Sequence, residues 1–313
     1  MARRLPPQLS QQPDLFAASF ADIPIRDQRD TMERPFFSLA KKPRLTPIEY
    51  QVGNVWVKVS ANQEFGMATI WDADILIWAS TQITEQLDRG GVPSRKIHFH
   101  PYNLLCSIRR STGGKDYTRL RSALQRLTHT AVQTNIRAEG KKQFSSFHWL
   151  EGWTETIDEK TGEPTGMTLT LPDWLYTGIT ERGGVLTIHE DYFLLTGGIE
   201  RWLYRVARKH AGSQELGWSF TMKQLYEKSG SAARLSDFAI DIRKAAETNQ
   251  IPEYQMSLSR NAEGEECVHF LSRTHLGEGN PAKEFTRHPR RRLGSGIFTG
   301  PVQLGLEDDD SGD

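Results

Sequence analysis

The sequence feature that most constrains this fold is a pattern of elements that occurs twice along the chain. Each half predicts a helix, a second helix, a short turn, a third helix and then a β-hairpin. This is the order of a winged helix-turn-helix domain, whose last helix enters the major groove of DNA. We therefore predict an α+β protein with two tandem winged helix-turn-helix domains and disordered N- and C-terminal arms.

In the first half, helices are predicted over residues 72–87, 102–109 and 115–130, with Asp72 placed to cap the first. Pro101 suits the first turn of the middle helix, where its missing N–H costs nothing. Strands are predicted at 52–60, 97–99, 131–137, 143–149 and 167–171. The pair 131–137 and 143–149 is the predicted hairpin that follows the third helix.

The second half shows a clearer helical period. Apolar residues recur at helical spacing from Ile199 to Ala207, and Thr221 with Gln224 fits a capping box that opens a short helix ending near Lys228. A third helix is predicted over 234–249, with Leu235 on its buried face, and Pro252 marks its end. Strands at 254–259 and 267–272 complete the second hairpin.

Composition and glycine positions predict the domain boundaries. Residues 1–44 are polar with short apolar islands, which indicates a flexible arm. We expect the first winged-helix domain at 45–180 and the second at 181–275, because glycines interrupt the pattern near 177–185. Residues 276–313 contain blocks of opposite charge, which are typical of a disordered tail.

Formal net charge is zero, but the basic residues are not evenly distributed. Between residues 103 and 142 nine Lys and Arg residues face two acids, which is the local charge that phosphate binding requires. Cys106 and Cys267 are far apart, which argues against a zinc site or a disulfide framework and for a reducing compartment. With no apolar run long enough for a membrane span and no signal peptide, we expect a cytoplasmic protein without a cofactor or metal.

The third helix of each half supplies the candidate DNA-binding residues, together with the loop of the first hairpin. Arg, Lys, Ser and Thr side chains reach phosphates and base edges. Ile240 could touch a thymine methyl or be a scattered surface residue, and part of the basic surface could serve a protein interface instead. The candidates are Lys115, Thr118, Arg119, Ser122, Arg126, Lys141, Lys142, Ser236, Asp237, Ile240, Arg243 and Lys244.

Three stretches, at residues 32–39, 66–76 and 195–205, resemble the bacterial plasmid replication initiator protein A family. The resemblance extends from about residue 30 to about residue 273 and involves no catalytic residue. It implies binding to double-stranded origin DNA at repeated sites, local opening of the duplex, and recruitment of host replication proteins such as a helicase or the host initiator. It also implies that the first domain can serve dimerisation.

The arm contains one further motif, Gln12-Pro13-Asp14-Leu15-Phe16, which resembles the short peptide that binds the bacterial sliding clamp. Leu15 and Phe16 would fill an apolar pocket while Gln12 bonds at its rim, and a flexible arm supplies reach. A five-residue match in a Gln-rich arm can also arise by chance.

We expect a DNA-binding initiator that is not an enzyme, and three other functions compete with this interpretation. A rolling-circle nicking enzyme would use His98 and His100 for a metal and Tyr117 or Tyr226 as nucleophile, but Pro101 follows at once and starts a helix. An ATP-driven initiator would need a phosphate-binding loop, and Gly113-Gly114-Lys115 lacks its other residues. A transcriptional regulator without a role in replication remains the main alternative.

Overall fold

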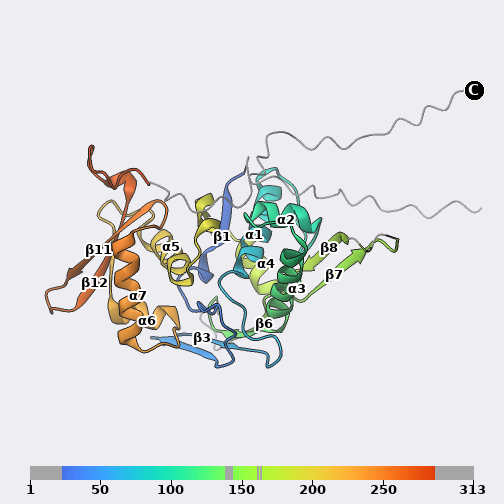
Figure 1. Ribbon diagram of the computed structural model, residues 1–313, viewed down its shortest axis with the longest axis horizontal. Coiled ribbons are helices and arrows are strands. Elements are labelled where there is room, and N and C mark those ends of the chain that lie inside the picture. Colours follow the sequence, from blue (N-terminus) through green and yellow to red (C-terminus); the bar gives the residue numbers. More distant parts are fainter. Residues whose placement is uncertain (1–22, 138–143, 161, 163, 286–313) are drawn as a thin grey trace, which may run out of the picture.

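The computed structural model describes residues 23–137, 144–160, 162 and 164–285, which form a mixed α/β fold (Figure 1). Two similar units lie side by side, and a four-stranded sheet lies along their lower edge (Figure 1). The predicted clamp peptide, Lys141, Lys142 and most of the charged tail lie outside the described residues.

The first unit consists of three helices and three strands. In chain order they are α1 (Ala73–Asp88), β4 (Lys96–Phe99), α2 (Pro101–Ser107), α3 (Gly114–His129), β7 (Gly152–Ile157) and β8 (Pro164–Thr170). The sheet order is β4-β8-β7 and all pairs are antiparallel, so the strand between the first two helices joins the last strand of the unit.

The second unit repeats this plan. Its elements are α5 (Gly198–Ala211), β10 (Trp218–Thr221), α6 (Met222–Ser229), α7 (Leu235–Thr248), β11 (Tyr254–Arg260) and β12 (Glu266–Ser272). The sheet order is β10-β12-β11, again antiparallel and again with the strand before the second helix paired to the last strand. The two units thus share both their element order and their strand order.

The local sequence explains the helix ends of the second unit. Both hydrogen bonds of the predicted capping box form, because the Thr221 hydroxyl accepts from the Gln224 amide and the Gln224 side chain accepts from the Thr221 amide. Gly230 then ends α6 at φ +58°, a backbone conformation that glycine adopts without strain. Asn249 ends α7 in the same left-handed region.

The four-stranded sheet corrects two expectations about strands. The predicted strand at 52–60 is part of a hairpin, β2 (Ile48–Val52) and β3 (Val55–Ser60), which turns at Gly53 with φ +58°. The hairpin predicted after the third helix, β5 (Ala131–Thr134) with β6 (Ser145–His148), joins this sheet in the order β2-β3-β5-β6. The hairpin of the first unit is instead β7–β8, and β7 was missed because its side chains show little apolar alternation.

The expectation of an arm up to residue 44 is wrong from residue 25 onward. β1 (Ile25–Gln28) pairs antiparallel with β9 (Val185–Ile188), with Ile25 opposite Ile188 and Gln28 opposite Val185. Met32 and Phe36 are fully buried, and Phe37 stacks on Trp149 with centroids 4.6 Å apart. These apolar residues are few in the local sequence, and their burial depends on partners far along the chain.

The remaining elements connect these parts. The helix α4 (Asp173–Thr180) occupies the start of the predicted seam, so the chain there is folded and packs against α1. Three short 3-10 turns complete the described structure and span Arg29–Thr31, Glu190–Leu194 and Arg273–His275.

Two buried ion pairs join α5 to the first half of the chain. Arg201 donates to Asp74 of α1 at 2.5 Å, and neither side chain is more than 1% exposed. Arg205 donates both a 2.7 Å and a 3.0 Å bond to Asp27 of β1. Since an unpaired buried charge is strongly unfavourable, these pairs hold the two units in one arrangement.

We expect Arg201→Met to lower the free energy of unfolding by about 3–5 kcal/mol, because it leaves the Asp74 carboxylate buried without its main partner. Urea denaturation of the full chain measures the change. The matched control is Arg89→Met. It breaks the surface ion pair between Arg89, which directly follows α1, and Glu85 of α1. Its effect should stay below about 0.5 kcal/mol, and equal losses in the two variants would contradict the structural role of Arg201.

Candidate nucleic-acid interface

The helix α3 presents one apolar and one polar face. Its buried side chains, including Leu120, Leu124 and Leu127, follow helical spacing and fix the rotation of the helix. The opposite face is exposed and carries four of the predicted DNA-binding residues, Lys115, Thr118, Arg119 and Ser122. Arg119 is 76% exposed, and its 3.0 Å bond to Asp116 leaves most of the guanidinium open to solvent.

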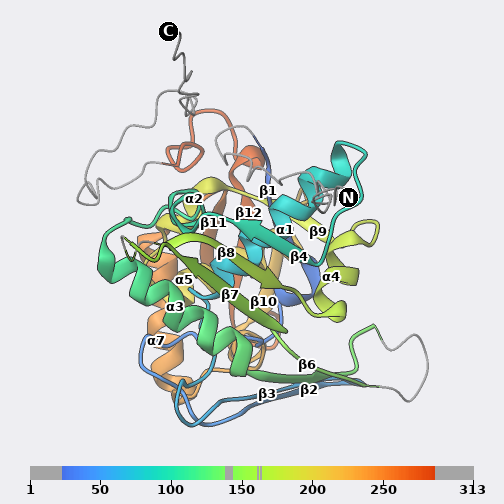
Figure 2. The same ribbon diagram turned by 90° about the vertical axis from the view of Figure 1, so that its right-hand side faces the viewer.

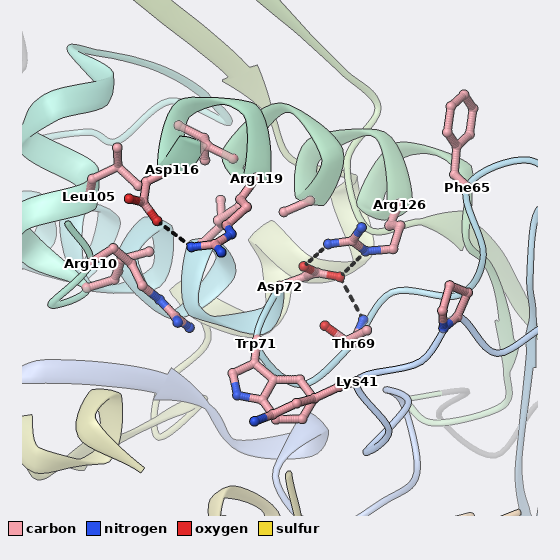
Figure 3. Close-up of a pocket in the computed structure, with 15 residues that line it drawn as sticks. Lys41, Phe65, Thr69, Trp71, Asp72, Leu105, Arg110, Asp116, Arg119 and Arg126 are labelled. Atoms are coloured by element: carbon pink, nitrogen blue, oxygen red, sulfur yellow. Dashed lines mark hydrogen bonds and ion pairs between the residues drawn. The ribbon is translucent and has the colours of Figure 1, made fainter. Parts of the chain in front are cut away.

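Arg126 differs from this set because its guanidinium is held within the fold. It donates two 2.7 Å bonds to the carboxylate of Asp72, which is 4% exposed and also accepts from the Thr69 amide (Figure 3). The hydrogen bond to this carboxylate raises the pKa of Arg126 above its usual value. Asp72 therefore joins α1 to α3. The expectation that its side chain caps α1 is wrong, because the side chain makes no capping hydrogen bond.

A groove of about 280 Å³ lies between α3, the start of α1 and the segment that contains Lys41 (Figure 3). Leu105 and Leu120 contribute apolar lining, and the Trp71 ring lies under the Lys41 ammonium at 5.7 Å. Four cationic side chains reach it, namely Lys41, Arg110, Arg119 and Arg126. Asp72 and Asp116 also line the groove, where they pair with Arg126 and Arg119.

In both units an arginine of the third helix is paired with a glutamate of the hairpin. Arg121 makes two 2.9 Å bonds to Glu155 of β7, and Arg243 makes bonds of 2.9 and 2.7 Å to Glu266 of β12. The bond from Arg243 lowers the pKa of Glu266 below its usual value. Arg243, a predicted DNA-binding residue, is therefore engaged in orienting α7 relative to its hairpin.

The exposed face of α7 carries Ser236, Ile240 and Lys244 as predicted, and Ile240 is 59% exposed. Asp237 accepts from Arg234 at 3.0 Å. Leu235 is 42% exposed, although its spacing predicted burial. It is the first residue of α7, and the buried residues of this helix begin about one turn later, at Phe238.

Both third helices lie on the same side of the molecule. They are in front in Figure 1, α7 to the left and α3 to the right, and both lie on the left in Figure 2. The described parts of the hairpin tips carry the acids Asp158, Glu159, Glu263 and Glu265. The cations beside them are Lys160 and Arg260, whose guanidinium donates to the Gly264 carbonyl.

The histidines of the nicking-enzyme alternative already have protein partners. The Nδ1 atom of His98 lies 2.8 Å from the Thr168 hydroxyl, and Nδ1 of His100 accepts from the Tyr102 amide at 3.2 Å. His100 thereby caps α2. Over residues 23–285 with the gaps given above, no three His, Cys, Asp or Glu side chains are grouped as a metal site.

The model of the family described as replication initiator protein A matches residues 26–256 of this chain. The chain belongs to this family. The match confirms the predicted resemblance and identifies the protein as a replication initiator, and it begins inside the segment that was expected to be an arm. No helix in the described ranges is long and apolar enough to cross a membrane.

Two further comparisons agree with this assignment. A protein of Wigglesworthia glossinidia brevipalpis named "Putative replication protein" is 34% identical over 235 residues, which are 74% of this chain and 84% of that protein. The crystal structure of domains 2 and 3 of RctB superposes with a TM-score of 0.56 at 12% identity, covering 75% of this chain and 94% of that one. At this identity the second match supports the fold alone.

We expect Arg119→Ala and Arg126→Ala to have different effects. Loss of Arg119 should leave the free energy of unfolding nearly unchanged but reduce the slope of log K against log salt by about 0.9 on a mixed-sequence duplex. Loss of Arg126 leaves Asp72 without its main partner and should lower the free energy of unfolding by about 1–3 kcal/mol. Salt titration of DNA binding and urea denaturation measure the two effects.

The result that would contradict this assignment is an unfolding transition of the Arg126→Ala variant that coincides with the wild type. Arg126 would then be a surface cation like Arg119. An unchanged salt slope for Arg119→Ala would remove the exposed face of α3 from the DNA contact.

Proposed function

We propose that both units are winged helix-turn-helix domains and that the protein initiates replication by binding specific, repeated sequences in double-stranded origin DNA. In this proposal α3 and α7 enter successive major grooves on one side of the duplex. The observation that carries it is the position of these two helices on one side of a molecule whose units share a buried ion pair, Arg201 with Asp74.

The exposed side chains of the two helices divide into two roles. Lys115 and Arg119 suit phosphate oxygens and guanine edges, and Thr118 and Ser122 can bond either. On α7, Lys244 and Ile240 are placed to contact base edges, with Ser236 beside them. Arg126 and Arg243 act indirectly, since their pairs with Asp72 and Glu266 fix the helices that carry the contacting residues.

Two further sets of DNA contacts are proposed. Asp237 holds the exposed guanidinium of Arg234 at the start of α7, where this cation can contact a phosphate. Lys141 and Lys142 would add phosphate contacts from the loop between β5 and β6.

Bound origin DNA would then open locally, and the complex would recruit a host helicase or initiator. Two copies of the protein would associate through the first unit.

Selection from random duplexes with the full chain, followed by footprinting of the selected DNA, tests the proposal. We expect a footprint with two protected major-groove segments at a fixed spacing of about 10 base pairs or a multiple, because the units are held in one arrangement. Inserting about 5 base pairs between the segments should abolish joint protection. Selection of no common sequence would overturn the proposal.

We expect Ile240→Ala and Lys244→Ala to relax sequence preference at one or two base pairs, by about 1–3 kcal/mol for each lost base contact. Competition between the selected site and sites with single changes measures this. The control is Lys283→Ala, an exposed lysine beyond β12. Variants as selective as the control would contradict base contact by α7.

The second candidate function is a transcriptional regulator, which would use the same DNA contacts. It differs in that a plasmid carrying the target site would replicate without the protein. A replication assay with and without the gene for the chain distinguishes the two, and replication in its absence would favour the regulator.

We further propose that Gln12, Leu15 and Phe16 bind the host sliding clamp. The variant Leu15→Ala/Phe16→Ala should lose clamp binding because the apolar anchors carry most of the energy of a small interface, while DNA binding stays unchanged. Titration of clamp against a fluorescent peptide of residues 8–20 measures this. No saturable binding up to about 1 mM clamp, roughly −4 kcal/mol, would show a chance match.

A further inference from the structure

Two exposed lysines lie in a short segment between β1 and β2. The segment Lys41-Lys42-Pro43, here called the basic arch, was expected in the arm. Lys41 and Lys42 are both exposed, and neither ammonium has a hydrogen bond or ion pair within the described part of the chain. The Lys41 ammonium lies over the Trp71 ring, which leaves its charge available.

Hydrogen bonds on both sides hold the basic arch in place. Before it, Ser38 exchanges backbone hydrogen bonds with the segment leading to α1, donating to Ala68 and accepting from Ile70, each at 3.0 Å. After it, the Arg44 carbonyl accepts from the Met67 amide at 3.0 Å. A loop fixed at both ends loses little conformational entropy when its side chains bind a ligand.

The basic arch lies beside α3 of the first unit, and the residue that follows it, Arg44, contacts the second unit. On one side, Lys41 and Pro43 line the same groove as Arg119 of α3 (Figure 3). On the other side, the Arg44 guanidinium donates to the carbonyl of Gly230, the residue that ends α6 before α7 begins. Lys41 therefore lies beside the exposed face of α3, and three residues later the chain is bonded to the turn that precedes α7.

We propose that Lys41 and Lys42 bind the DNA phosphates between the two major-groove segments that α3 and α7 occupy. This inference rests on the proposed function and adds a third contact, which is independent of sequence. Because the arch lies beside α3 and Arg44 joins it to the turn before α7, phosphates bound there would be positioned relative to both helices. Arg44 acts as a positioning residue, since its guanidinium is bonded to the carbonyls of Thr46, Pro47 and Gly230.

The test compares Lys41→Gln/Lys42→Gln with Lys96→Gln/Lys283→Gln, which removes the same charge from two exposed lysines outside α3, α7 and the arch. The probe is a duplex of about 40 base pairs selected with the full chain, long enough for two half-sites about one turn apart. For the arch variant, the slope of log K against log salt should fall by about 1.8. Its affinity loss between about 50 and 200 mM salt should become about tenfold smaller, and the control should follow the wild type.

A second measurement changes the DNA and leaves the protein intact. Neutral methylphosphonates placed between the two protected segments should weaken wild-type binding and have no further effect on the arch variant. If the wild type selects no sequence, the proposed function fails and the arch proposal fails with it. If the wild type gives the expected footprint but the arch variant behaves like the control, only the arch proposal is overturned.

Discussion

The arrangement of this molecule depends on the carboxylate of Asp74, which is fully buried at the start of α1. It accepts from Arg201 of α5 at 2.5 Å and from Arg110, in the turn before α3, at 2.8 Å. Arg201 also donates to the carbonyls of Leu195 and Phe193, so its buried guanidinium is well satisfied. One carboxylate thus connects α1 and the turn before α3 to α5, the first helix of the second unit.

This connection determines how the protein can meet a duplex. In a flexibly linked pair of domains, each helix could occupy its groove at variable spacing, and the second binding event would depend on linker length. Here Arg201 and Arg205 hold α5 against α1 and β1, so the positions of α3 and α7 are coupled. In the proposed function, a fixed pair of helices would match one spacing of half-sites, so the buried ion pairs would contribute to selectivity.

The cations near α3 serve two different purposes, and their positions in the sequence do not distinguish them. Arg119 and Arg126 are two turns apart on the same helix, yet one is open to solvent and the other is bonded to Asp72. Arg243 and Arg121 likewise bond to hairpin glutamates. The helical period predicts which residues leave the core, but an acceptor from another element decides whether a cation is available to DNA.

The sequence by itself determined the repeated order of helices, the capping box at Thr221 and the exposed face of α3, because these follow from local spacing and capping chemistry. It did not determine that residues 25–44 are folded, that β5 and β6 pair with β2 and β3 instead of forming the hairpin of the first unit, or that Lys41 lies beside α3. Those features depend on pairing between distant segments, such as β1 with β9. Only the tertiary structure decided them, because burial and strand pairing are set by partners that local periodicity does not specify.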